Sequence, residues 1–147
     1  MDKSIQETEE EITDEFSFFD NWQDKYEYVI ELGKKLKDFP EDERKDENKV
    51  KGCQSSVWIV TYDEGGRIYF KADSDSTIVK GLIALLVRVL NGRKPDEILD
   101  AKLEFLDKTE LKQRLAQTRA NGLAAMINQM KMYALAYKAK FESVNNK

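Results

Sequence analysis

The sequence predicts an α+β fold in which a small three-stranded antiparallel sheet is packed by helices. Two runs of β-branched and aromatic residues, 57–62 and 67–72, flank a four-residue turn that contains two glycines, a pattern typical of a hairpin. Apolar residues recur at spacings of three and four over residues 22–37 and again over 77–91, which indicates amphipathic helices. Because helices precede and follow the hairpin along the chain, the order favours α+β rather than a parallel α/β sheet.

The first twenty residues predict a short acidic helix. Apolar residues from Ile5 to Phe19 give it one apolar face, and we expect it to end near Asp20. Residues 1–20 hold eight acidic side chains against Lys3 alone, a net charge of −7 within a total of −4 for the chain. Such a charge is typical of a solvated helix.

The next elements are bounded by capping and stop signals. We expect the second helix to begin after an N-cap at Asn21 and to end before Pro40. Residues 38–49 are largely charged and predict a solvated loop. One of the polar residues 73–76 is expected to cap the helix after the hairpin, and Gly92 to end it.

Four more features are expected in the C-terminal third of the chain. Pro95 fits the first turn of a short helix. Residues 101–106 predict the third strand, and residues 111–115 another short helix. Thr118 is predicted to cap a long last helix with a broad apolar face, and residues 143–147 are expected to fray.

The 147 residues contain one Cys and no His, and these two counts exclude several classes of function. A single thiol rules out an intramolecular disulfide, a Cys-x-x-Cys redox pair and a Cys-rich zinc or iron–sulfur site. Without an imidazole, Ser-His and Cys-His nucleophile arrangements are excluded as well. We therefore predict neither a metal site nor a cofactor.

Length and composition predict one domain over residues 1–147. We expect its core at about 22–137 and its compartment to be the cytoplasm. The longest apolar stretch, 82–90, has nine residues and is interrupted by Arg88, whereas a membrane span needs roughly 20. The N-terminus lacks the pattern of a signal peptide, and one unpaired Cys favours a reducing compartment. No basic cluster with interleaved aromatic residues indicates nucleic-acid binding.

Cys53 lies in a small and polar segment, residues 50–56, just before the first predicted strand. A lone Cys is commonly a buried hydrophobe, but such a Cys is expected inside an apolar run, and this one is not. Gly52 permits a sharp backbone turn, while Lys49 and Lys51 are expected to favour a thiolate relative to the free-thiol pKa of about 8.5. The thiol lacks both a His base and a second Cys, so it suits the acceptance of a group with a partner's help.

Four motifs in this order resemble the SufE-like sulfur acceptors, a family that includes CsdE. The motif around the thiol is Gly52-Cys53-Gln54-Ser55, followed by Val57-Trp58. Residues 22–33 resemble the family's first core helix. Residues 72–75 and 78–82 resemble the family's passage from strand to helix. The family's helix start, Ser-Arg-x-Asn-Gly-Leu, is similar to residues 118–123, with Thr118 in place of Ser and with Gln117 where many members have Pro. The resemblance spans roughly residues 22–130.

The resemblance implies a carrier of persulfide sulfur. In that family a pyridoxal-phosphate-dependent cysteine desulfurase (SufS- or CsdA-like) passes sulfur to the acceptor thiol, here Cys53, and is stimulated by doing so. The sulfur then goes to an iron–sulfur scaffold complex (SufBCD-like). Such a protein is a co-substrate of the desulfurase rather than an independent enzyme. The implied fold also resembles IscU-type scaffolds, but these need several cluster ligands, whereas this chain offers one thiol.

Each residue named beside Cys53 has two interpretations. Arg119 either stabilises an anionic persulfide or holds the Cys53 loop. Gln54 and Ser55 either hydrogen-bond the sulfur or close the loop that Gly52 begins. Which role each residue has is left open by the sequence.

Other residues of the motifs are assigned to a partner surface or to packing. Asp75 either caps the following helix or belongs, with Lys51, to the surface that contacts the desulfurase. Trp58 is expected to lie in the core. The methionines of the last helix are interpreted as packing residues: Met126, Met130 and Met132.

Two functions from other classes remain as alternatives. An adaptor could activate a partner enzyme by contact alone, with Cys53 structural. A redox sensor with one exposed Cys is the third candidate, and it is weakened by the absence of a resolving thiol.

Overall fold

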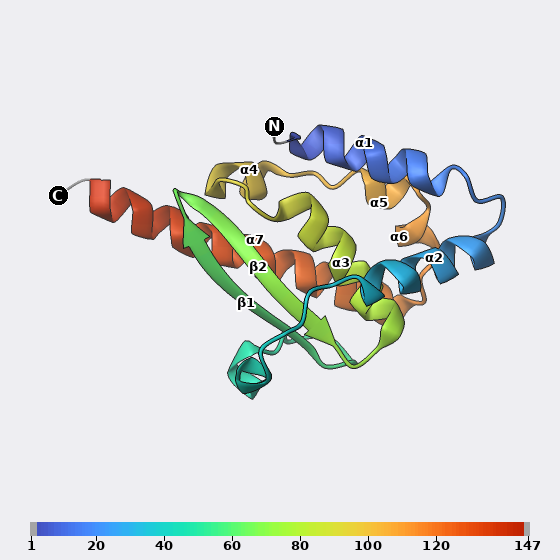
Figure 1. The fold of residues 1–147 in the computed structure, drawn as a ribbon, viewed down its shortest axis with the longest axis horizontal. Helices are drawn as coiled ribbons and strands as arrows, with labels where there is room; N and C mark the ends of the chain where they lie inside the picture. Colours follow the sequence, from blue (N-terminus) through green and yellow to red (C-terminus); the bar gives the residue numbers. More distant parts are fainter. Residues whose placement is uncertain (1–2, 146–147) are drawn as a thin grey trace.

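The computed structural model describes residues 3–145, which form helices around one antiparallel hairpin (Figure 1). Two short 3₁₀ turns, Glu41–Glu43 and Asp46–Asn48, lie in the charged loop before the hairpin. In chain order the other elements are α1 Ile5–Phe16, α2 Trp22–Lys34, β1 Val57–Glu64, β2 Arg67–Ser74, α3 Thr77–Leu90, α4 Pro95–Asp100, α5 Phe105–Lys108, α6 Leu111–Arg114 and α7 Gln117–Asn145. Figure 1 shows α3 between the hairpin and α1. Hydrogen bonds between two tyrosines of α7 and β1 hold α7 against the hairpin.

The predicted hairpin is confirmed, with strands two residues longer than the sequence pattern indicated. The register runs from Val57 opposite Ser74 to Glu64 opposite Arg67. Only Gly65 and Gly66 form the turn, and both have positive φ angles, 60° and 79°, as the tightest hairpin turns require. One face of the hairpin is buried against the helices, and its apolar members are Val57, Ile59, Ile68, Phe70 and Ala72.

The predicted third strand over residues 101–106 is wrong, because the sheet within residues 3–145 has two strands. Leu103 has a positive φ of 55°, which breaks an extended path, and α5 begins at Phe105. The alternating apolar side chains of this segment are buried although its backbone is not a strand. Their burial accounts for the alternating sequence pattern that predicted a strand. The outer edge of β2 pairs instead with the residues after α3: Ile68 N–H donates to the Arg93 carbonyl at 2.9 Å.

Helices α2 and α3 cross with their backbones in contact. A Cβ atom built on Gly33 would lie 2.7 Å from the backbone nitrogen of Gly81, and one built on Gly81 would overlap Val29. The crossing therefore requires glycine on both helices. The predicted cap at Asn21 is confirmed, since its side chain accepts a hydrogen bond from Asp24 N–H at 2.9 Å.

The acidic helix α1 is docked onto the body of the protein. Ile12 and Phe16 are fully buried and belong to the hydrophobic core, which the sequence analysis placed at 22–137. Buried Arg93 donates to the carbonyl of Lys3 and to Thr8 Oγ1. The helix ends at Phe16 rather than near Asp20, so the following residues form a connection in which Phe18 is 83% exposed.

The long helix α7 extends through residues 143–145, which were expected to fray, and residues 146–147 of that predicted tail lie outside the described range. It begins at Gln117, so the prediction that Thr118 caps it is wrong, and Thr118 lies in the first turn. Among the helices of residues 3–145, none combines the length and the apolar character that a membrane crossing needs.

Candidate functional site

Cys53 lies on a turn that directs its thiol toward the start of α7. Just before the turn, Val50 N–H donates to the Val57 carbonyl at 2.8 Å and ties the loop to β1. Gly52 then adopts a φ of +93°, a conformation that favours glycine. The Cys53 side chain is half-buried, and its S–H donates to the Gly122 carbonyl with an Sγ–O distance of 3.5 Å.

Gly122 lies where the Cys53 loop contacts α7. It is buried inside the helix, and a Cβ built on it would lie 3.5 Å from Cys53 Sγ. A Cβ built on Gly52 would meet the Cβ of Ala125 at 3.4 Å. A glycine therefore lies on one side of each of these two contacts, and an added Cβ would meet its neighbour at an ordinary van der Waals distance.

The thiol opens into a cleft with a volume of about 360 Å³. Val79, Leu123 and Met126 form its buried apolar part, and exposed Thr118 and Arg119 lie at its rim. The cleft combines a buried apolar part with one cation at its rim, as a site for a sulfur anion would. Its other lining residues are Cys53, Gln54, Ser55, Ala116 and Gly122.

Burial raises the pKa of the Cys53 thiol above its ordinary value. The expectation that Lys49 and Lys51 favour the thiolate is therefore wrong for this conformation. Lys49 pairs with Asp46 at 3.3 Å and lies over the Trp58 ring, while Lys51 is exposed to solvent. The thiol is thus protonated and weakly nucleophilic at neutral pH.

We expect the alkylation of Cys53 by iodoacetamide to be slow at pH 7 and to rise with pH through a midpoint above that of an accessible thiol. The raised pKa requires this direction, because only the thiolate reacts and its fraction grows as pH exceeds the pKa. The measurement is the alkylation rate from pH 6 to 10, followed by intact mass. The same protein unfolded in urea is the control, and a native midpoint at or below the unfolded one would contradict the burial of the thiol.

Of the predicted neighbours, Arg119, Gln54 and Ser55 are all brought to the cleft. Arg119 is exposed and forms no ion pair with any residue of 3–145. Its guanidinium is therefore available to an anion in the cleft. Gln54 is exposed and Ser55 half-buried.

Asp75 ties the end of the Cys53 loop to the end of β2. Its Oδ1 accepts from Ser56 N–H at 3.0 Å, and its own N–H donates to the Ser56 carbonyl at 3.2 Å. The interpretation of Asp75 as a helix cap is wrong, because Ser76 caps α3 through Val79 N–H. Asp75 and Lys51 are both exposed.

Trp58 is half-buried rather than a core residue, and it lies between two cations. The Arg44 guanidinium and the Lys49 ammonium are 5.5 and 5.8 Å from its ring centroid, within the range of cation–π attraction. Arg44 also pairs with buried Asp73, the residue opposite Trp58 in the hairpin. Burial alone would raise the pKa of Asp73, but hydrogen bonds from Arg44, from Ser74 N–H and from Lys80 hold it below its ordinary value.

Sequence reasoning did not select Gly122 or the buried lining of the cleft as site residues. A glycine inside a helical segment is a signal of close approach, and it would have identified Gly122. Val79, Leu123 and Met126 carry no such signal, because their apolar side chains fit ordinary helix packing equally well. The pairing of Arg44 with Asp73 joins residues that are far apart in the sequence.

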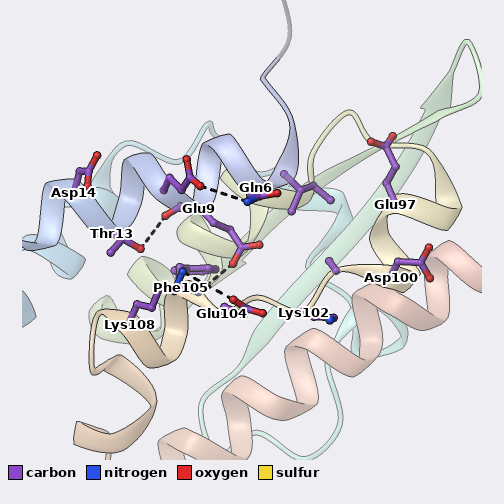
Figure 2. A pocket seen from close by; sticks show the side chains of 13 residues that line it. Gln6, Glu9, Thr13, Asp14, Glu97, Asp100, Lys102, Glu104, Phe105 and Lys108 are labelled. Atoms are coloured by element: carbon purple, nitrogen blue, oxygen red, sulfur yellow. Dashed lines mark hydrogen bonds and ion pairs between the residues drawn. The ribbon is translucent and has the colours of Figure 1, made fainter.

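A second groove, of about 480 Å³, lies between α1 and the segment from α4 to α5 (Figure 2). Its carboxylates are mainly structural or solvated: Glu9 Oε1 accepts from Phe105 N–H at 3.0 Å and so holds the start of α5 against α1. No group of three or more candidate ligands for a metal ion occurs among residues 3–145. This groove therefore attaches the acidic helix and offers no reactive group comparable to Cys53.

Comparison with known proteins finds similarity to one family over most of the chain. A family model, SufE, described as an Fe-S metabolism associated domain, matches residues 10–134. A SufE-like protein of Rhizobium meliloti is 44% identical over 131 residues, which cover 85% of this chain and 93% of the relative. A SufE-like protein of Rhizobium etli is 42% identical over 128 residues, which cover 83% of this chain and 86% of the relative.

The fold also has a counterpart among solved structures. The solution structure of a hypothetical protein from Thermus thermophilus matches with a TM-score of 0.73 at 18% identity, covering 90% of this chain and 96% of that one. At this identity the match concerns the fold alone. Because the family model covers most of the chain and the two relatives match over most of their length, this chain belongs to the SufE family, whose members are associated with iron–sulfur metabolism.

Proposed function

We propose that this protein is a persulfide carrier that accepts sulfane sulfur on Cys53 from a cysteine desulfurase and delivers it for iron–sulfur cluster assembly. The observation that carries the proposal is the single thiol at the mouth of a cleft that has a buried apolar part and the Arg119 cation at its rim. Membership of a family associated with iron–sulfur metabolism supports the same conclusion. A reduced thiol is needed at rest, which favours the cytoplasm as the compartment.

The transfer is a thiolate exchange that needs no external oxidant. The Cys53 thiolate attacks the terminal sulfur of the desulfurase persulfide, forms a new S–S bond and breaks the old one. The products are Cys53–S–SH and the desulfurase thiolate, so the sulfane sulfur and its proton move together. Because the attacking thiol must first lose its own proton, and burial raises its pKa, the docked partner has to supply the base or the environment that ionises it.

The residues around the cleft have distinct roles in this proposal. Arg119 stabilises the anionic persulfide, while Gln54 and Ser55 lie where they can hydrogen-bond the added sulfur. Gly52 allows the loop to present the thiol. Exposed Asp75 and Lys51 belong to the surface that contacts the desulfurase.

The test is persulfide formation measured by intact mass. After incubation with a pyridoxal-phosphate-dependent cysteine desulfurase and L-cysteine, the wild type should gain one sulfur atom, about 32 Da, while Cys53→Ala should gain none, because the carbon side chain left by the substitution cannot form the S–S bond. Dithiothreitol should remove the added mass. An adduct of equal yield on Cys53→Ala would show that the sulfur is carried elsewhere.

A further inference from the structure

The exposed side of α7 has an unusual surface for this highly charged chain. Residues at spacings of three and four, which share one side of a helix, form a series that is exposed and uncharged. Among the described exposed residues, Met132 and Leu135 are two of the few large apolar side chains, with exposed fractions of 54% and 51%. We define the α7 face by Asn121, Ala124, Asn128, Met132 and Leu135, all exposed.

No charged side chain interrupts the α7 face, although 35% of the residues in the chain are charged. Lys131, the charged residue within that stretch, turns its ammonium away and donates to the carbonyls of Ala101 and Leu99 at 2.7 and 3.4 Å. The half-buried Lys131 thus attaches α7 to the end of α4. The face is left neutral over roughly 20 Å of helix, at 1.5 Å per residue.

The α7 face begins at the cleft that holds the thiol. Thr118, three residues before Asn121, lies on the rim of the cleft, and Gly122 accepts the hydrogen bond from Cys53. A protein that covers the thiol therefore reaches the first residues of the face. Since a specific interface uses about 20–30 residues on each partner, it must extend well beyond the ten residues that line the cleft.

The charges around the cleft indicate the direction of that extension. Exposed cations precede cleft residues in the chain: Lys49 and Lys51 come before Cys53, and Lys112 and Arg114 come before Ala116. The centres of protein interfaces are depleted in charge, whereas their rims are polar. The neutral α7 face fits the centre, and these exposed cations fit the rim.

We propose that the α7 face is a docking surface for the enzyme that donates sulfur to Cys53, an inference that rests on the proposed carrier function. The enzyme is expected to place an apolar, weakly charged surface on Met132 and Leu135 while its persulfide enters the cleft. Met132 and Leu135 contribute to binding of the enzyme and not to the sulfur transfer itself, because Leu135 lies about 20 Å along the helix from Gly122.

The test introduces a carboxylate at the far end of the face. Leu135→Glu, and in a second variant Met132→Glu, should raise the concentration of this protein that gives half-maximal persulfide loading by a desulfurase and L-cysteine by about ten-fold. Loading by inorganic polysulfide, a small donor that needs no docking surface, should be unchanged. The matched control is Val144→Glu, which places the same charge at an apolar residue, 63% exposed, near the end of the same helix.

Four outcomes decide the proposal. The proposal is overturned if Leu135→Glu and Met132→Glu reach half-maximal persulfide loading at the same concentration as the wild type. It is also overturned if Val144→Glu raises that concentration as much as they do. A wild-type dimer in sedimentation that Leu135→Glu dissociates would assign the face to a second copy of the chain instead. If the desulfurase loads no sulfur onto the wild type while polysulfide does, the proposed carrier function is wrong, and the proposed docking surface is then wrong as well.

Discussion

Replacing Cys53 with Ser should abolish stimulation of the desulfurase while leaving binding between the two proteins intact. The hydroxyl is nearly the size of the thiol and can donate to the same Gly122 carbonyl, so the loop keeps its conformation. An alcohol oxygen, however, cannot accept sulfane sulfur by thiolate exchange. The expected result is desulfurase turnover at its unstimulated rate, with an unchanged dissociation constant.

The measurements are alanine release from L-cysteine under a fixed concentration of reductant and calorimetric titration of the desulfurase. Ser17→Ala, which removes an exposed hydroxyl outside the cleft, in the connection that follows α1, is the control and should still stimulate. This experiment separates the carrier from the adaptor, because an adaptor in which Cys53 is only structural would still stimulate after the substitution. Full stimulation by Cys53→Ser would therefore replace the carrier with the adaptor.

Gly81→Ala should lower the free energy of unfolding by about 2–4 kcal/mol, although alanine is the better helix former by about 1 kcal/mol. The added methyl group would overlap the carbonyl oxygen of Val29 and lie 2.6 Å from its Cγ1. Both atoms belong to the packed crossing of α2 and α3, and a backbone contact cannot be relieved by a side-chain rotation. The two helices must separate, and the core between them loses contacts.

Urea unfolding followed by circular dichroism measures this loss, with Gly122→Ala as the matched control. That substitution adds the same methyl group inside a helix but at an ordinary contact distance of 3.5 Å from Cys53 Sγ. The control should unfold at or above the wild-type urea concentration, because helix propensity dominates there. Equal midpoints for the two variants would show that the helices do not cross as closely as described.

The elements with a strong local signal were predictable from the sequence. The hairpin followed from two β-branched runs around paired glycines, and α2 from its apolar spacing and the cap at Asn21. The segment 101–106 was not predictable, since its alternating apolar residues are buried by a connection that bends at Leu103. Alternation reports which side chains are buried, and only the backbone angles distinguish a strand from such a connection.

The candidate site was predictable as a set of residues but not in its electrostatics. Cys53 and Arg119 were both identified, and both line one cleft. The direction of the pKa shift at Cys53 was missed, because burial raises the pKa of the thiol, which contacts α7 about seventy residues further along the chain. Lys49, four residues before Cys53, is engaged with Asp46 and Trp58.

The residues that border the two edges of the hairpin have a consequence for concentrated solutions. Near the turn, the outer edge of β2 is occupied by the Arg93 carbonyl and by Asn91 Oδ1, which accepts from Phe70 N–H at 2.7 Å. On the other edge, the Ile59 carbonyl of β1 accepts from the Tyr133 hydroxyl at 3.3 Å. An exposed strand edge can pair with the strand edge of another molecule, and aggregation of folded chains can begin in this way. Because both edges are partly occupied by groups of the same chain, this two-stranded sheet is protected against edge-to-edge association with other molecules.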